Sequence, residues 1–600
     1  MVDASATTAS PRPRGRSGLA AIAALCLAWV LIMQSLGWAQ TSYFAFVKGL
    51  GDGTPQIDRY HWETRDKSYT DGHFFSVKAP GLPVLLLPAW KALDAVGAPS
   101  LAADAADAAR RGGARQWTYR GLNVSAYGYD ITRARQIKRT LEHQAPLIWV
   151  LGLLGTVLPA VLLLLLVRRI VDRRHPGLGT ATALSLGAGT LLMPFAVNLF
   201  GHALAALIGF AAFALLLRER QGPPRTALVA LAGLIAGAAV LVEYPLAFAG
   251  AVIGVYAVLR GDVLARGIGA VLRRAGAFAA GAIAGAAPVA AYNLWAFGSV
   301  TRMSYDNAVD QQGFTGHATL GLNSGGFFGI GVPHVRTALE LLFSPRGIVA
   351  LTPVVALGVA GIVLLHRRGR RAEALTIGGV VLVFLIYDAG YWLPFGGGSP
   401  GPRFLVATLP FLALGIAETW RRAPATTLVL STCGAVVMAA ATLTYPLIGT
   451  GSLGQWWTRI DRGVFQHTLL SPLGAGDGWI ALAPVLFALA AAAVLGARAT
   501  GPLAVRADAR LALGALAGWV LLVALVGPAL GERRVLRVGA PIGPTVHAAL
   551  PWQIILAAAL AALLALGGAL RAERRAAPPA RALPPDPDDQ QRAAADLAHV

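Results

Sequence analysis

The sequence predicts an all-α protein that crosses a membrane many times. Of its 600 residues, 56% are hydrophobic and only 14% are charged, and the mean hydropathy is +0.59. Apolar runs of about 20 residues, enough to cross roughly 30 Å of hydrocarbon as a helix, recur along the chain. Basic residues cluster at the ends of these runs, as the positive-inside rule describes, so the formal net charge of +21 indicates membrane topology rather than nucleic-acid binding.

The first apolar run, residues 19–38, follows Arg12, Arg14 and Arg16 and could be taken for a signal peptide. It is long enough to span, and no clean small-x-small cleavage pattern follows it. We expect an uncleaved first helix, with residues 1–16 as a cytoplasmic tail. Both cysteines, Cys26 and Cys433, fall inside apolar runs, which predicts two small buried side chains and no disulfide.

A polar region, residues 39–144, comes next and is too long for a simple connector. Within it, residues 82–90 are apolar but too short to span, which indicates a helix lying at the membrane interface. The Ala-rich residues 101–115 predict an exposed helix. The basic residues 133–139 are expected to face lipid phosphates.

About fourteen spans are predicted, with both chain termini in the cytoplasm. They are 19–38, 146–167, 179–197, 203–217, 226–242, 245–259, 275–295, 347–365, 375–392, 404–417, 426–447, 479–495, 511–530 and 552–570.

This topology places two long polar segments, 39–144 and 296–346, outside the cytoplasm. Arg533, Arg534 and Arg537 are an exception to the basic pattern, because they also fall outside; they contact lipid phosphates there or the last two spans are miscounted. Residues 576–600, rich in Pro, Ala, Arg and Asp, predict a disordered cytoplasmic tail. Chemistry is therefore expected outside, where ATP and sugar nucleotides are scarce.

The stretch from residue 49 to 83, GLGDGTPQIDRYHWETRDKSYTDGHFFSVKAPGLP, is polar and aromatic and suggests the front of an active site. Asp58 follows a Gly-rich turn among aromatic residues, where a carboxylate could accept a proton from a hydroxyl or bind a metal with the same effect. Asp66 and Asp71 compete for this role. The alternative for Asp58 is a solvated loop aspartate.

Lys78, in SVKAPGLP, precedes a Pro-Gly turn that opens a helix, a plausible phosphate site at the membrane surface. Arg403, in a Gly-rich GPRF segment, can grip a phosphate with two hydrogen bonds. Snorkelling toward the interface is the alternative for both residues.

Further ionisable and aromatic residues are possible accessories, because charged groups at membrane depth are rare without a function. They are Tyr60, Asp66, His73, His202, Glu243, Arg346 and Asp388. Walker-type, HExxH, paired CxxC and helix-opening GxSxG motifs are absent, so NTP hydrolysis, zinc proteolysis and serine hydrolysis have no support.

Four motifs in order carry a family resemblance. They are GHFFSVKAPG at 72–81, FGS…Y at 297–305, LFSPRG at 342–347 and GGGSPGPRF at 396–404. With the early aspartate after a first helix, the chain resembles the GT-C superfamily of polytopic glycosyltransferases, which includes protein O-mannosyltransferases and the lipid A aminoarabinose transferase. It looks most like an uncharacterised bacterial branch of that group.

The resemblance implies a GT-C-like catalytic module over residues 17–420, followed by C-terminal membrane helices over 421–575. It implies transfer of a sugar from a polyprenyl-phosphate donor to an extracytoplasmic acceptor, usually with inversion, in a multi-pass protein of the cell membrane. Asp58 matches the family's first-loop acid, Lys78 its donor-phosphate lysine and Arg403 an arginine taken to contact phosphate. Many relatives have an acidic pair where this chain has Asp58 alone, which puts a tightly held metal in doubt; a divalent ion is possible but not required.

The main rival is a transporter or flippase of a lipid-linked envelope precursor, and a non-catalytic envelope scaffold is a third class. Transporters place charges near the bilayer midplane and show inverted repeats, whereas this chain concentrates polar residues in two outer loops. The sugar, the acceptor and the oligomeric state do not follow from the sequence.

Overall fold

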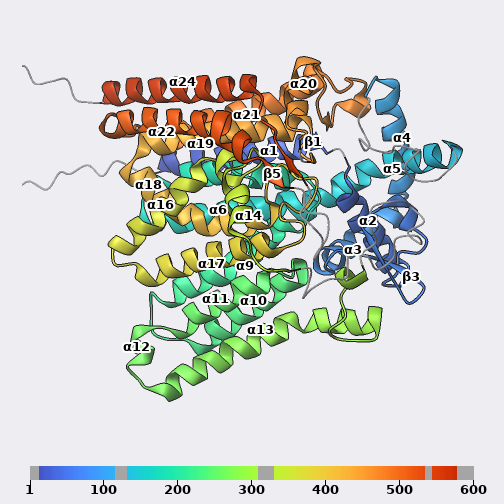
Figure 1. Cartoon of the computed structure of the whole chain (residues 1–600), viewed down its shortest axis with the longest axis horizontal. Helices are drawn as coiled ribbons and strands as arrows, with labels where there is room; N and C mark the ends of the chain where they lie inside the picture. Colours follow the sequence, from blue (N-terminus) through green and yellow to red (C-terminus); the bar gives the residue numbers. More distant parts are fainter. Residues whose placement is uncertain are drawn as a thin grey trace, which may run out of the picture.

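The computed structural model describes residues 12–34, 36–114, 131–307, 330–449, 451–533 and 544–576. Long helices run side by side along the long axis of the molecule, and the segment from α2 to α4 is gathered at one end of this bundle (Figure 1). The described strands form only two-stranded pairs, β1–β4, β2–β3 and β5–β6. The all-α class is therefore confirmed.

The N-terminal half contains α1 (Arg12–Leu31), β1 (Ile32–Met33), α2 (Trp38–Gly51), β2 (Lys67–Thr70), β3 (His73–Ser76), α3 (Gly81–Ala95), α4 (Ala98–Arg111), α5 (Ile131–Gly152), α6 (Leu158–Arg174), α7 (Gly179–Gly189), α8 (Leu192–Val197), α9 (His202–Glu219), α10 (Thr226–Val242), α11 (Leu246–Val258), α12 (Gly261–Leu264) and α13 (Ile268–Phe297). The C-terminal half contains α14 (Val335–Phe343), α15 (Ile348–Leu351), α16 (Val354–Arg367), α17 (Arg371–Gly390), α18 (Leu409–Arg422), α19 (Pro424–Thr444), α20 (Gly454–Asp461), β4 (His467–Thr468), α21 (Trp479–Thr500), α22 (Ala509–Leu521), α23 (Gly527–Leu530), β5 (Glu532–Arg533), β6 (Thr545–Val546) and α24 (Trp552–Ala576).

Within the described ranges, nine helices are long and apolar enough to cross a membrane, or up to eleven if two sharply bent pairs each count as one span. The bent pairs are Gly81–Ala95 with Ala98–Arg111, at 82°, and Val335–Leu351 with Val354–Arg367, at 96°. Three shorter apolar helices are Arg16–Leu31, Thr226–Val242 and Leu246–Val258. This composition supports a membrane-embedded protein, while the total of fourteen spans stays a prediction.

The first helix ends earlier than expected. Instead of running to Trp38, α1 stops at Leu31, and Ile32–Met33 pairs with His467–Thr468 as a short antiparallel ladder. Gln34 follows, and its side-chain oxygen accepts a hydrogen bond of 2.9 Å from the backbone N–H of Leu199. The strand pairing and the Gln34 hydrogen bond thus end the helix before the hydrophobic run ends. Trp38 is the first residue of the next helix, α2.

Two other expected spans are interrupted. Residues 179–197 divide into α7 and α8 at Thr190, whose hydroxyl donates to the Leu186 carbonyl at 2.5 Å and accepts from the Leu192 N–H at 3.2 Å. Residues 347–365 divide at Pro353, between α15 and α16. Since proline has no N–H to donate, the helix cannot continue through this position with all its hydrogen bonds.

Glycines let some helices pack with their backbones in contact. On α10, a Cβ added at Gly233 or Gly237 would lie 2.2 Å from the Phe278 carbonyl oxygen or 2.1 Å from that of Ala282 on α13. Gly281 and Gly285 of α13 are equally close to α10. Small residues four apart on both helices are typical of membrane helix pairs, because close backbone approach increases van der Waals contact.

The helices of the first polar region are more buried than expected. The predicted exposed helix at 101–115 corresponds to α4, which buries one face of alanines, including Ala102 and Ala106, and packs on α5. The predicted interfacial helix corresponds to α3. Arg533, for which lipid contact and a miscount of the last two spans were the alternatives, pairs with the buried Glu340 at 2.7 Å. Arg534 and Arg537 lie outside the described residues.

Candidate functional site

A tight hairpin brings Asp66 next to Lys78. Strands β2 and β3 pair antiparallel around Asp71 and Gly72, both with positive φ, 51° and 88°. An Asp-Gly pair favours such a two-residue turn because both positions tolerate the left-handed region. Lys67 is therefore opposite Ser76. Asp66 lies one residue before Lys67 and Lys78 two residues after Ser76, so both are at the same end of the hairpin.

Lys78 and Asp66 form an ion pair. The Lys78 side chain is only 9% exposed, whereas that of Asp66 is 32% exposed, so the carboxylate can be reached from outside. Burial lowers the pKa of Lys78, and the Asp66 carboxylate opposes this shift. Arg403 lowers the pKa of Lys78 further, whereas Glu243 raises it. These four charged groups therefore belong to one site, although they come from three separate parts of the chain.

Helix α2 supports this pair from behind. The Ser42 hydroxyl donates to the Asp66 backbone carbonyl at 2.5 Å, and it also lies 2.8 Å from the Ser76 hydroxyl. The ring of Tyr43 is 5.7 Å from the Lys78 ammonium, and the Tyr43 hydroxyl accepts from the Gly201 N–H at 3.3 Å. The hairpin is thus fixed to α2, and α2 is fixed to the start of α9.

Glu243 and His202 form the next layer. Glu243 lies in the turn between α10 and α11, outside both apolar helices, and its carboxylate is 3.3 Å from His202 Nδ1. A Cβ added at Gly201 would lie 2.8 Å from this carboxylate, so the absence of a side chain there is what lets the groups meet. Burial raises the pKa of Glu243 to about 7, while Arg403 and Lys78 act in the opposite direction.

The start of α3 is also pressed against the end of α10. A Cβ added at Gly81 would lie 2.6 Å from the Leu241 carbonyl oxygen. Since Lys78 precedes Gly81 by three residues and Glu243 follows Leu241 by two, this backbone contact brings the lysine and the glutamate to the same end of the bundle. The Pro80–Gly81 turn therefore positions Lys78.

Arg403 approaches from the glycine-rich loop after α17. Its guanidinium lies 5.5 Å from the ring centroid of Phe200 and 5.2 Å from that of Phe404. Gly396 has a φ of +74°, and a Cβ there would lie 2.3 Å from Arg403 Nε. A side chain at that position would displace the arginine, so glycine is required for both backbone and packing reasons.

Arg346 holds the loop that carries Arg403 and does not join the site itself. Its guanidinium donates to the carbonyl oxygens of Gly397 and Ser399, both at 2.9 Å, and pairs with Glu532 at 2.9 Å. Both side chains of this ion pair are nearly buried. Arg346 is thus a positioning residue.

Asp388 is completely buried in α17, within electrostatic range of Arg403. Among the described residues, neither of its carboxylate oxygens has a hydrogen-bond partner. Buried polar groups in native proteins nearly always have one, so an unpaired carboxylate requires an explanation such as a ligand or a functional proton.

Asp58, the first expectation for the acidic residue, lies elsewhere on the hairpin. Its two oxygens are 2.6 Å from the Phe74 N–H and 2.7 Å from His73 Nδ1, and its side chain is 40% exposed. This arrangement braces the hairpin. Tyr60, likewise, donates to Asp52 at 2.9 Å and covers Lys48 rather than approaching Lys78.

A metal site is not supported by these contacts. Asp58, the residue considered for one, has both oxygens in hydrogen bonds to His73 and Phe74. Within the part of the chain that the structure describes, no three His, Cys, Asp or Glu side chains gather as a metal site.

The pairing of Asp66 with Lys78 could have been found from the sequence. The Asp71–Gly72 dipeptide predicts a two-residue turn, and counting outward from it places Asp66 and Lys78 at the same end of the hairpin. By contrast, no local signal marks Tyr43 or Gly201, because their roles depend on contacts 158 residues apart.

Comparison of the chain with protein-family models, curated proteins and solved structures found no match. The site is therefore interpreted from its own geometry.

Proposed function

We propose that this protein is a GT-C-type glycosyltransferase that moves a sugar from a polyprenyl-phosphate carrier to an extracytoplasmic acceptor. The observation that carries the proposal is the Asp66–Lys78 ion pair within electrostatic range of Arg403 and Glu243 at one end of a helical bundle of membrane-spanning composition. Two cations and a reachable carboxylate are the groups that transfer from a phosphate leaving group requires.

Lys78 and Arg403 are the proposed donor-binding residues. Lys78 is buried and Arg403 is partly buried, and a positive charge screened from water acts more strongly on a phosphate than one in bulk solvent. The planar guanidinium of Arg403 can form two parallel hydrogen bonds to phosphate oxygens, and the Lys78 ammonium adds a point charge. Together they would stabilise the charge that develops on the departing polyprenyl phosphate.

Asp66 is the proposed proton acceptor, in place of Asp58. The acceptor hydroxyl would attack the anomeric carbon, the bond from that carbon to the phosphate oxygen would break, and the hydroxyl proton would pass to the Asp66 carboxylate. In-line displacement of this kind inverts the anomeric configuration. Asp66 suits the role because it is both paired with the phosphate-binding lysine and one-third exposed.

The finer features of the fold and location belong to the same proposal. They are a GT-C-like module over residues 17–420, about fourteen membrane crossings, a place in the bacterial cell membrane and a site on its extracytoplasmic side. The basic helix ends opposite α2 and α3 support this orientation, since cytoplasmic ends carry the excess of Lys and Arg.

The test is turnover by the purified full chain in detergent with a panel of polyprenyl-phosphate sugars. Release of polyprenyl phosphate, followed by mass spectrometry, is the expected result with at least one donor and an extract of envelope acceptors. A chain that moves a lipid-linked sugar across proteoliposome membranes without consuming any donor would instead be a flippase, and the proposal would fail.

A further inference from the structure

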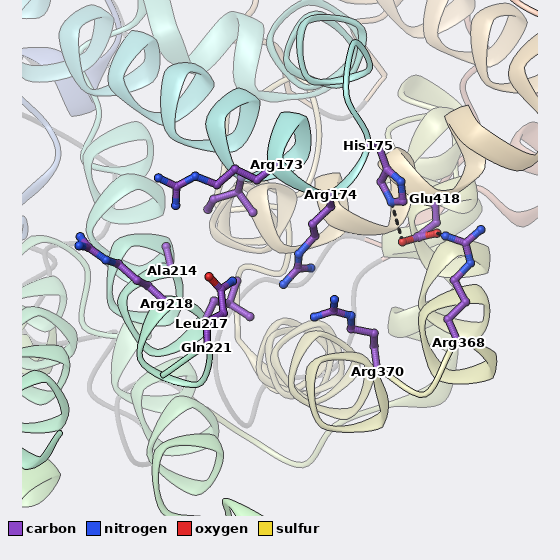
Figure 2. A pocket seen from close by; sticks show the side chains of 11 residues that line it. Arg173, Arg174, His175, Ala214, Leu217, Arg218, Gln221, Arg368, Arg370 and Glu418 are labelled. Atoms are coloured by element: carbon purple, nitrogen blue, oxygen red, sulfur yellow. Dashed lines mark hydrogen bonds and ion pairs between the residues drawn. The ribbon is translucent and has the colours of Figure 1, made fainter. Parts of the chain in front are cut away.

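A second charged site lies at the other end of the bundle from Asp66 and Lys78. A cavity of about 650 Å³ is bounded by the ends of α6, α9 and α18 and by the connection between α16 and α17. Its lining residues are Ile170, Arg173, Arg174, His175, Ala214, Leu217, Arg218, Gln221, Arg368, Arg370 and Glu418 (Figure 2). The lining thus contains five arginines and one carboxylate.

The single carboxylate of the cavity is already engaged. Glu418 Oε1 is 2.9 Å from His175 Nε2, and its other oxygen is 2.5 Å from Arg368. The Glu418 side chain is only 5% exposed, so it serves as an anchor at the cavity wall. It cannot also neutralise the four remaining arginines.

Arg174 and Arg370 are the two arginines that converge in the cavity. Figure 2 shows both side chains extending into the space between the helix ends, with their guanidinium groups facing each other. Arg370 pairs with Glu373 at 3.6 Å. Among the described residues, Arg174 has no carboxylate within ion-pair distance. Arg174 is half-buried and Arg370 is exposed. Their like charges repel each other, and this repulsion is relieved when an anion binds between them.

Simple membrane anchoring does not explain this arrangement. Arginines that only reach lipid phosphates extend outward individually, as the exposed Arg169 and Arg367 can do. The cavity arginines come from α6, α9 and the connection between α16 and α17, and Arg174 and Arg370 extend toward each other.

We propose that this arginine cavity binds a phosphate-bearing anion, either the headgroup of an anionic lipid or a soluble phosphate compound. The inference does not depend on the proposed glycosyltransferase activity. Helix α9 separates the two sites: His202 begins it, and Arg218 is 16 residues further on, which corresponds to about 24 Å. The cavity is therefore a distinct site.

The experiment measures two probes on the full chain purified in neutral detergent. Inorganic pyrophosphate is titrated while thermal unfolding is followed by tryptophan fluorescence, and phosphatidylglycerol is compared with phosphatidylcholine by native mass spectrometry. Wild type is expected to bind pyrophosphate, phosphatidylglycerol or both. The double variant R174A/R370A is expected to raise the apparent Kd at least ~10-fold, because two charge-assisted contacts are lost.

The matched control is R169A/R367A, which removes the same charge from neighbouring exposed positions and is expected to change the apparent Kd less than ~2-fold. If the alanine pair does not fold, R174Q/R370Q is used under the same conditions. Binding of the lipid alone would identify a headgroup site, and binding of pyrophosphate alone a soluble ligand. Failure of wild type to bind either probe, or equal weakening by the control pair, would overturn the proposal.

Discussion

The ammonium of Lys78 and the carboxylate of Asp66 form an ion pair that closes the open end of the β2–β3 hairpin. Lys78 is buried there, while Asp66 remains partly exposed. The buried ammonium is within electrostatic range of Arg403 and Glu243, whereas the carboxylate is accessible to solvent.

Replacing Asp66 by asparagine is predicted to abolish most transfer without loss of folded protein. The amide keeps the shape and can still contact Lys78, but it cannot take a proton, so turnover should fall by ~10²–10⁴-fold. The measurement is kcat with the best donor from the polyprenyl-phosphate panel.

Asp58→Asn is the matched control for this change. Its Oδ1 can still accept from the Phe74 N–H, so turnover should stay within a few-fold of wild type. If Asp58→Asn abolishes transfer and Asp66→Asn does not, the assignment of the proton acceptor is wrong.

Lys78→Ala is predicted to weaken use of the donor more than use of the acceptor. Removing a buried cation that contacts phosphate should lower kcat/KM for the donor by ~10–100-fold, because a charge-assisted hydrogen bond is lost. Lys91→Ala, on the exposed face of α3, is the control and should have no effect. Unchanged donor kinetics in Lys78→Ala would rule out this lysine as the phosphate ligand.

The affinity for the donor is predicted to depend on pH through Glu243. Because the pKa of Glu243 is raised to about 7, the carboxyl is protonated below pH 7 and ionised above it. Above pH 7, its negative charge partly neutralises the positive charges of Lys78 and Arg403. This weakens their attraction for the donor phosphate, so KM for the donor should rise as pH increases from 6 to 8. Glu243→Gln should flatten this dependence while wild type retains it; identical pH profiles would contradict the role.

Gly81→Ala is predicted to destabilise the protein. The new Cβ would lie 2.6 Å from the Leu241 carbonyl oxygen, and the backbone atoms it meets must shift, at a cost of ~1–3 kcal/mol. The thermal midpoint in detergent should fall. Gly276→Ala, which has open space on α13, should leave it unchanged or slightly higher. Equal midpoints for the two variants would show that α3 does not need this close contact.

Arg346→Met is predicted to loosen the loop that carries Arg403. The change leaves the buried Glu532 carboxylate without its cation, which costs ~3–5 kcal/mol when one partner of a buried pair is removed. The thermal midpoint should fall. Replacing both partners, as Arg346→Met with Glu532→Gln, should recover part of that loss, and no recovery would mean that the hydrogen bonds to Gly397 and Ser399 dominate.

Composition and local pattern were sufficient for the class of protein and for part of the site. Long apolar runs must avoid water, and basic residues at their ends cannot cross the bilayer, so an all-α membrane protein follows from the chain alone. The Asp71–Gly72 turn also fixes the hairpin register, because only such residues accept its backbone angles. Asp66 and Lys78 are therefore neighbours for a local reason.

Tertiary structure decided which distant groups join them and where the helices end. Glu243 and Arg403 come within electrostatic range of Lys78 where Gly81 lets α3 approach α10 and Gly396 leaves room for the arginine. The first expected span ends early, before Gln34, whose side-chain oxygen accepts a hydrogen bond from the Leu199 N–H, 165 residues away. Such contacts join residues far apart in the chain, so their energies depend on the packed fold and on no single segment of the sequence.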